Sequence, residues 1–110
     1  MRRFASLRRR SEFAFLRRRG RMMKTPDLTL YHTLGGSDVR ASVGISVGKA
    51  VGGAVIRNLL RRRLQSILQA SLSDVPQRLL VVPQPGAALL NFRDLSDQLR
   101  RILRVLEVKA

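Results

Sequence analysis

The side chains that could perform catalysis are few in this sequence, and they are not grouped. His32 is the only histidine, cysteine is absent, and no acidic residue or serine lies within four positions of His32. The aspartates sit mostly at predicted turns and helix ends, where bonding to the local backbone explains them. They are Asp27, Asp38, Asp74, Asp94 and Asp97. We therefore expect neither catalytic side chains nor metal ligands, and we interpret His32 as a packed or hydrogen-bonded residue.

Binding chemistry is concentrated in the stretch KAVGGAVIRNLLRRRLQ, Lys49 to Gln65. At 100° per residue, one arc of about 140° on a helix collects six long polar side chains. They are Arg57, Asn58, Arg61, Arg62, Gln65 and Gln69. The rest of the helix is largely apolar, through Ile56, Leu60, Leu64, Ile67 and Leu68. The pattern predicts one surface for a core and another for an anionic partner.

The alternative interpretation of this arginine face is an ordinary solvated helix surface. Such surfaces usually alternate the sign of charge, so that side chains four residues apart form ion pairs. No Asp or Glu occurs between Lys49 and Ser73, so neighbouring arginines repel each other along the helix. This one-signed pattern favours binding over solvation.

The whole chain points in the same direction. Its 110 residues carry 22 Lys plus Arg against 7 acidic residues, a formal net charge of +15. A polyanion such as nucleic acid would screen this repulsion. Only three of the basic residues are lysines, and arginine suits bidentate contacts to phosphate. The absence of cysteine is compatible with a reducing cytoplasm, and no apolar run approaches the roughly 18 residues of a membrane span.

The first 24 residues hold ten basic side chains. An arginine-rich start with few acids is also typical of a mitochondrial transit peptide, which would be absent from a mature protein. We expect residues 1–10 to form a flexible basic arm. Ser11 is then predicted to cap a short helix that Gly20 ends in a left-handed conformation.

Periodicity predicts the remaining elements of one domain spanning residues 1–110. Alternation at 28–34 and again at 39–47, separated by turn residues at 35–38, indicates an antiparallel hairpin. Helices are expected over 54–72 and 92–107, the second capped by Asn91, with a short buried strand at 79–82. The order is α-β-β-α-β-α, which favours an α+β fold with helices covering one sheet.

Aromatic side chains add a second kind of binding chemistry. Phe13 and Phe15 would point about 200° apart on a helix, so they cannot both enter the same core. One is free to face a groove, together with Tyr31 from the adjacent strand. Aromatic rings flanked by arginine stack on single-stranded bases.

A family resemblance follows from these residues. The segment VGISVGKAVGGAVIRNLLRRRLQSIL resembles the signature of the bacterial ribonuclease P protein component, which reads Ser-Val-x-Lys, Gly-x-Ala-Val and Arg-Asn-Arg-x-Lys-Arg. The matching residues are Ser46, Val47, Lys49, Gly52, Ala54, Val55, Arg57, Asn58, Arg61 (in place of Lys) and Arg62. SEFAFLRRRG, TLYH and LLVVPQPGAA are similar to other parts of the family.

The resemblance implies a two-layer α/β sandwich with about four strands, three helices and a left-handed β-α-β crossover. It implies a subunit that helps a catalytic RNA to remove the 5′ leader of precursor tRNA, with Mg²⁺ held mainly by the RNA. The implied RNA contacts are Lys49, Arg57, Asn58, Arg61, Arg62 and Gln65. The implied residues of the leader groove are Phe13, Arg17 and Tyr31. The implied partners are ribonuclease P RNA and precursor tRNA, without a membrane or an obligate protein partner, in the cytoplasm.

Four positions depart from the family pattern: Ala50 and Gln65 replace basic residues, Leu59 replaces an arginine, and Arg17 replaces a phenylalanine. On the helical wheel Leu59 falls outside the arginine arc, and Arg63 is a candidate to replace its charge. We expect these departures to affect the affinity for RNA rather than the family assignment. Two other classes share the charge: a structural or ribosomal RNA-binding protein, and a nucleoid DNA-binding protein.

Overall fold

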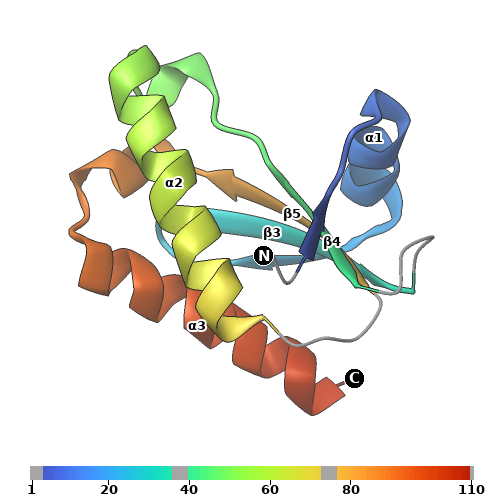
Figure 1. Cartoon of the computed structure of the whole chain (residues 1–110). Coiled ribbons are helices and arrows are strands. Elements are labelled where there is room, and N and C mark those ends of the chain that lie inside the picture. The colour runs from blue at the N-terminus through green and yellow to red at the C-terminus, as the bar shows by residue number, and fades with distance from the viewer. Residues whose placement is uncertain (1–3, 36–39, 73–76, 110) are drawn as a thin grey trace.

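The computed structural model describes residues 4–35, 40–72 and 77–109, and Figure 1 shows their arrangement. Within these ranges the chain forms five strands, three α-helices and two short 3₁₀ helices. The strands are β1 Phe4–Ser6, β2 Arg21–Lys24, β3 Leu28–Leu34, β4 Ala41–Ile45 and β5 Gln77–Pro83. The helices are α1 Arg10–Arg19, η1 Lys49–Val51, α2 Ala54–Ser71, η2 Pro85–Leu89 and α3 Phe92–Lys109. The predicted α+β class with three helices is confirmed, but the sheet has five strands rather than about four.

The strands form one mixed sheet in the order β1-β4-β5-β3-β2. Strand β5 is parallel to β4 and antiparallel to β3, so it lies between them. The predicted hairpin of 28–34 with 39–47 is therefore wrong. Leu79, Leu80 and Val81 are all fully buried, and a strand that is apolar on both faces occupies the centre of a sheet. Of the predicted turn, Gly35 has φ +79°, while residues 36–38 lie outside the described residues.

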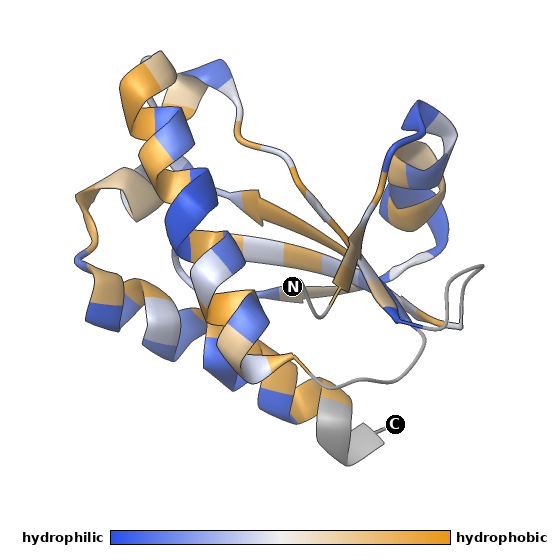
Figure 2. Ribbon diagram, in the orientation of Figure 1, coloured by the Kyte–Doolittle hydropathy of each residue, from blue (hydrophilic) through white to orange (hydrophobic). Residues whose placement is uncertain are grey.

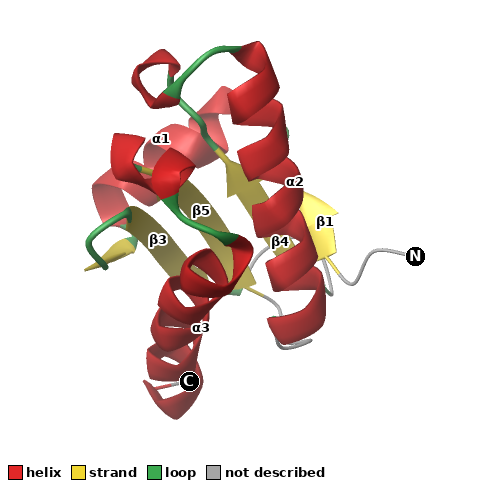
Figure 3. Ribbon diagram, turned by 90° about the vertical axis from the view of Figure 1, so that its left-hand side faces the viewer, coloured by secondary structure: helices red, strands yellow, loops and turns green. Residues whose placement is uncertain are grey.

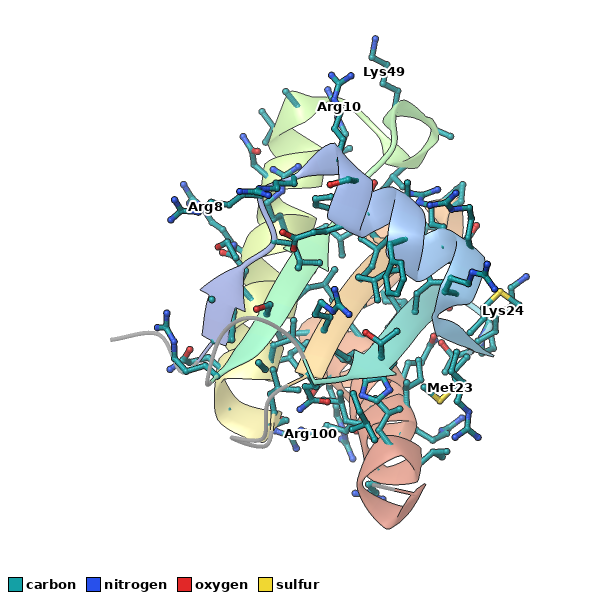
Figure 4. The ribbon with its side chains drawn as sticks, turned by 90° about the vertical axis from the view of Figure 1, so that its right-hand side faces the viewer. Arg8, Arg10, Met23, Lys24, Lys49 and Arg100 are labelled. Carbon is teal, nitrogen blue, oxygen red and sulfur yellow. The ribbon has the colours of Figure 1, made fainter. Side chains whose placement is uncertain are left out.

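Helices cover both faces of this sheet, as Figures 3 and 4 show from opposite sides. Helices α2 and α3 pack on one face over the main core, which includes Leu30, Val43, Leu64 and Leu99. The apolar sides of these helices face the sheet and their polar sides face outward (Figure 2). Helix α1 lies on the other face over a smaller cluster of Leu7, Leu16 and Leu80.

The N-terminal region differs from expectation. Residues 4–6 form a strand parallel to β4 in place of a loose arm, because Phe4 and Leu7 are buried. The residue before α1 is Arg9, without a side-chain cap, so Ser11 lies inside the helix. Gly20 is extended (φ −69°, ψ 151°) and not left-handed. Glycine fits there because a Cβ atom would collide with the carbonyl oxygen of Leu16.

The other elements follow the periodicity closely. Helix α2 ends one residue before the predicted 54–72, and α3 extends two residues past 92–107. The backbone N–H of Asp94 donates to Asn91 Oδ1 at 2.8 Å, which confirms the predicted cap. Strand β5 is longer than 79–82, and β2 was not predicted. The β4-α2-β5 connection joins parallel neighbours, and it is the crossover for which the resemblance implies a left-handed sense.

Candidate nucleic-acid interface

The arginine face of α2 borders the buried side of the helix. Leu60, Leu64, Ile67 and Leu68 enter the main core, whereas Ile56 in the first turn is 45% exposed, contrary to its predicted place on the core side. Arg57, Arg61 and Gln65 are half-buried along the edge of the packed surface, while Asn58 and Arg62 are exposed. Five of the six residues predicted to contact RNA therefore share one continuous surface.

In the described part of the chain, the guanidinium groups on this face have no acidic partner. Among the residues that the structure describes, no carboxylate lies within 4.0 Å of Arg57, Arg61 or Arg62. Arg57 Nε is covered and has no hydrogen-bond acceptor, a state that costs about 1–3 kcal/mol for a polar group. An incoming phosphate would meet charge that the described protein does not neutralise.

Asn58 holds one of these arginines in position. The Nη1 group of Arg61 donates a hydrogen bond to Asn58 Oδ1 at 2.8 Å, one helical turn away. This bond turns the guanidinium along the helix surface and limits its rotamers. In the pair Arg57-Asn58, Arg57 thus supplies a charge to the face, and Asn58 supplies the amide that orients Arg61.

Lys49 stands apart from the other predicted RNA contacts. It is exposed in η1, before α2 begins, and it projects outward at one end of the molecule in Figure 4. Arg10 at the start of α1 projects toward the same side in that view. Lys49 therefore extends the positive surface past the helix rather than joining its arginine face.

A groove of about 170 Å³ connects α2 with α1. It runs along the β1–β4 edge and is lined from four segments: Phe4, Ser6, Leu7, Phe13, Val43, Gly44, Ile45, Arg61 and Gln65. Phe13 lies over Gly44, where an added Cβ would approach its ring to 2.7 Å. The structure thus brings a predicted leader-groove residue together with two predicted RNA contacts of α2.

The other two predicted groove residues lie along α1 and β3. Tyr31 is half-buried and packs, like Phe13, against the small cluster of Leu16 and Leu80. Arg17 is exposed, and its Nη2 donates to Ser46 Oγ at 3.5 Å. Position 17 therefore carries a cation that reaches the segment after β4. In the sequence, Ser46 stands out only as part of the family signature, and nothing there predicts its contact with α1.

Two further residues of α2 are directed elsewhere. Leu59 is 48% exposed, outside the arginine face as predicted. Arg63 does not replace its charge on that face, because Arg63 Nη1 donates to the Leu90 carbonyl at 3.4 Å, at the junction of η2 and α3. Ala50 is exposed beside Lys49, and Gln65 lines the groove.

His32 is buried and hydrogen-bonded, as expected from its strand. Its Nε2 lies 3.0 Å from Gln77 Oε1. Burial lowers the pKa of His32 below its ordinary value of 6.5, the bond to Gln77 opposes this, and the nearby charge of Arg21 lowers it further. The imidazole is therefore neutral near pH 7 and faces the core rather than the groove.

The described residues do not form a cation site. In the parts of the chain that the structure describes, no three His, Cys, Asp or Glu side chains gather closely enough to hold a metal ion. The groove is lined by arginine, which repels divalent cations. The resemblance implies Mg²⁺ held mainly by the RNA, and this binding stays a prediction.

None of the helices in the described part of the chain combines the length and the apolar character that crossing a membrane needs.

Comparison with known proteins agrees with this geometry. The chain is similar in fold to the ribonuclease P protein of Staphylococcus aureus (TM-score 0.85, 19% identity, covering 94% of this chain and 95% of the other). It is also similar to that of Thermotoga maritima (TM-score 0.77, 21% identity, covering 89% and 94%). No match was found among curated proteins. The family model for ribonuclease P matches residues 1–107, and the chain therefore belongs to the ribonuclease P protein family.

Proposed function

We propose that this chain, as the protein subunit of ribonuclease P, binds the catalytic RNA and the single-stranded 5′ leader of precursor tRNA to support leader removal. The observation that carries the proposal is the groove in which Phe13 meets Arg61 and Gln65. It joins an aromatic surface to a guanidinium surface that has no acidic partner among the described residues. Stacking and phosphate binding are the two interactions that an unpaired RNA strand needs.

The two surfaces would divide the work. The arginine face of α2, half-buried at Arg57 and Arg61 and exposed at Arg62, presents planar donors to phosphates of the folded catalytic RNA. The half-buried rings of Phe13 and Tyr31 offer apolar surface to leader bases, and exposed Arg17 on the same helix as Phe13 offers a cation to the leader backbone. The same chain would thereby hold the catalytic RNA and its substrate next to each other.

Phosphodiester hydrolysis would take place on the RNA subunit. Magnesium bound to RNA phosphates would supply charge neutralisation and an activated water there. The role of this protein is then to position the leader and to screen repulsion between two polyanions. The buried, neutral His32 takes no part in the reaction.

Phe13→Ala tests the groove. Loss of one stacked base should weaken binding of long-leader precursor tRNA by about 5-fold or more, since a stacked base contributes about 1–3 kcal/mol. Leaderless tRNA should bind the reconstituted enzyme as before. Phe92→Ala is the matched control, because Phe92 is 45% exposed at the start of α3, outside the groove. Equal losses for leaderless and long-leader RNA would remove the groove from the proposal.

A further inference from the structure

Phe15 stacks on an arginine of the sheet. Helix α1 crosses the strands, and Phe13 and Phe15 project about 200° apart around it. Phe13 lies over Gly44, whereas the Phe15 ring centroid is 4.9 Å from Arg78 Cζ in β5. Phe15 therefore marks a surface on the side of α1 away from Phe13.

Two hydroxyl groups flank this arginine. Arg78 pairs in register with Thr33 of β3 and with Ser42 of β4, so all three side chains lie on the α1 face of the sheet. A guanidinium between two hydroxyls is a donor set that suits the oxygens of a phosphate. Arg78 is half-buried, so part of the side chain still faces solvent.

The bonding capacity of this row is unused. Thr33 Oγ1 and Arg78 Nε are both covered, and neither has a hydrogen-bond partner among the residues that the structure describes. Within the described ranges, no carboxylate lies within 4.0 Å of the Arg78 guanidinium. An unsatisfied buried polar atom destabilises a fold, so an isolated fold gains little from placing these groups here.

A purely structural role explains only part of the arrangement. The attraction between a cation and an aromatic ring accounts for the position of Phe15 against Arg78. It does not satisfy Thr33 Oγ1 or Arg78 Nε. An aliphatic pair at these positions would pack against Phe15 without leaving polar atoms unsatisfied. What the row lacks is an anion, and the chain, at +15, lacks anions generally.

We propose that Arg78, with Thr33 and Phe15, forms a second RNA-backbone site on the side of α1 away from the groove, and that Arg78 binds a phosphodiester there. This rests on the proposed RNA-binding function and adds a contact outside the signature helix. Phe15 holds the guanidinium plane, and the solvent-facing end of Arg78 contacts the phosphate. Thr33 Oγ1, which is covered in the free protein, joins this contact as the side chains adjust on binding. The phosphodiester belongs either to the catalytic RNA or to the leader strand.

Arg78→Gln, Thr33→Val and the control Arg101→Gln test the site. Arg101 is exposed on α3, which covers the other face of the sheet, and its substitution changes the net charge equally. Affinity is measured from 50 to 200 mM salt for two probes: ribonuclease P RNA alone and a single-stranded oligoribonucleotide with a leader sequence. Thermal unfolding of each variant checks the fold, and Arg78→Lys keeps the charge while removing the planar fork.

We expect Arg78→Gln to weaken one of the two probes about 3- to 10-fold and to make its log–log salt slope shallower by about 0.7–0.9, the value for one phosphate. Thr33→Val should weaken the same probe about 2-fold, and the probe affected identifies the source of the phosphodiester. Arg78→Gln and Arg101→Gln behaving alike with both RNAs would overturn the site and leave the proposed function standing. Wild-type protein binding neither RNA would overturn both.

Discussion

Removing two arginines from the α2 face should change how RNA binding responds to salt. Arg61 lines the groove and bonds to Asn58, while Arg62 is exposed beside it, and neither has an acidic partner among the described residues. Each phosphate that a protein neutralises releases condensed counterions. The variant Arg61→Ala with Arg62→Ala should therefore release fewer counterions, by the number that two phosphate contacts release. Alanine preserves the helix.

The magnitude follows from counting contacts. With about 5 to 8 phosphates bound, log K should fall with log salt at a slope of roughly −4 to −7. Two lost contacts make the slope shallower by about 1.4–1.8. Over a fourfold rise in salt, from 50 to 200 mM, the affinity ratio of wild type to variant should therefore shrink about tenfold.

Filter binding or fluorescence anisotropy with ribonuclease P RNA measures both slopes. Arg101→Ala with Arg104→Ala removes the same charge from exposed positions of α3, and it should leave the slope within about 0.5 of wild type. Parallel slopes for wild type and the α2 variant would refute the reasoning. They would mean that these arginines act only through the general field of the protein.

Three further predictions concern the scaffold. Gly44→Ala places a Cβ 2.7 Å from the Phe13 ring and should destabilise the fold by about 1–3 kcal/mol in urea unfolding, with part of the loss recovered by adding Phe13→Leu. Because the pKa of His32 is lowered, the unfolded chain binds the proton more readily; the free energy of unfolding should therefore fall as pH drops below about 6.5, by at most about 1.4 kcal/mol per pH unit. His32→Gln should flatten that profile, and an unchanged slope would contradict it. Gln98→Ala removes bonds that tie α3 to the β2–β3 turn and should cost about 1–3 kcal/mol, whereas exposed Asp97→Ala should cost far less.

Hydrophobic periodicity is sufficient to predict an element when that element buries a single face. The helices around Leu64 and Leu99 came within two residues of their true ends, because their buried positions recur at helical spacing. The Asn91 cap was also predictable, since it depends on side chains only three residues apart.

Strand pairing was not predictable in the same way. Whether β4 pairs with β3 or with β5 depends on burial between segments far apart in the sequence. Residues 79–81 are apolar on both faces, and this places β5 between β3 and β4 only when all strands are compared. β1 was missed because Phe4 and Leu7 are isolated among arginines. Their burial depends on the parallel pairing of β1 with β4, which places Phe4 in the main core and Leu7 in the small cluster under α1.

For the candidate site as well, local features are predictable from the sequence and long-range ones are not. The arginine face was readable because its residues lie on one helix. The groove was not, since it needs Phe13, Gly44 and Arg61 from three elements. The aromatic pattern and the resemblance supplied Phe13 as a groove residue, and the resemblance supplied Arg61 as an RNA contact. The fold explains why they meet: Gly44 leaves room for the Phe13 ring over the sheet.

Reconstitution with a bacterial ribonuclease P RNA at low magnesium tests the central claim most directly. The chain should restore cleavage of a long-leader precursor tRNA at the 5′ end of the mature tRNA, and the double arginine variant should restore it only at higher protein concentration or lower salt. Tight RNA binding without any rescue of cleavage would contradict the account. It would identify the arginine face with a structural RNA-binding role instead.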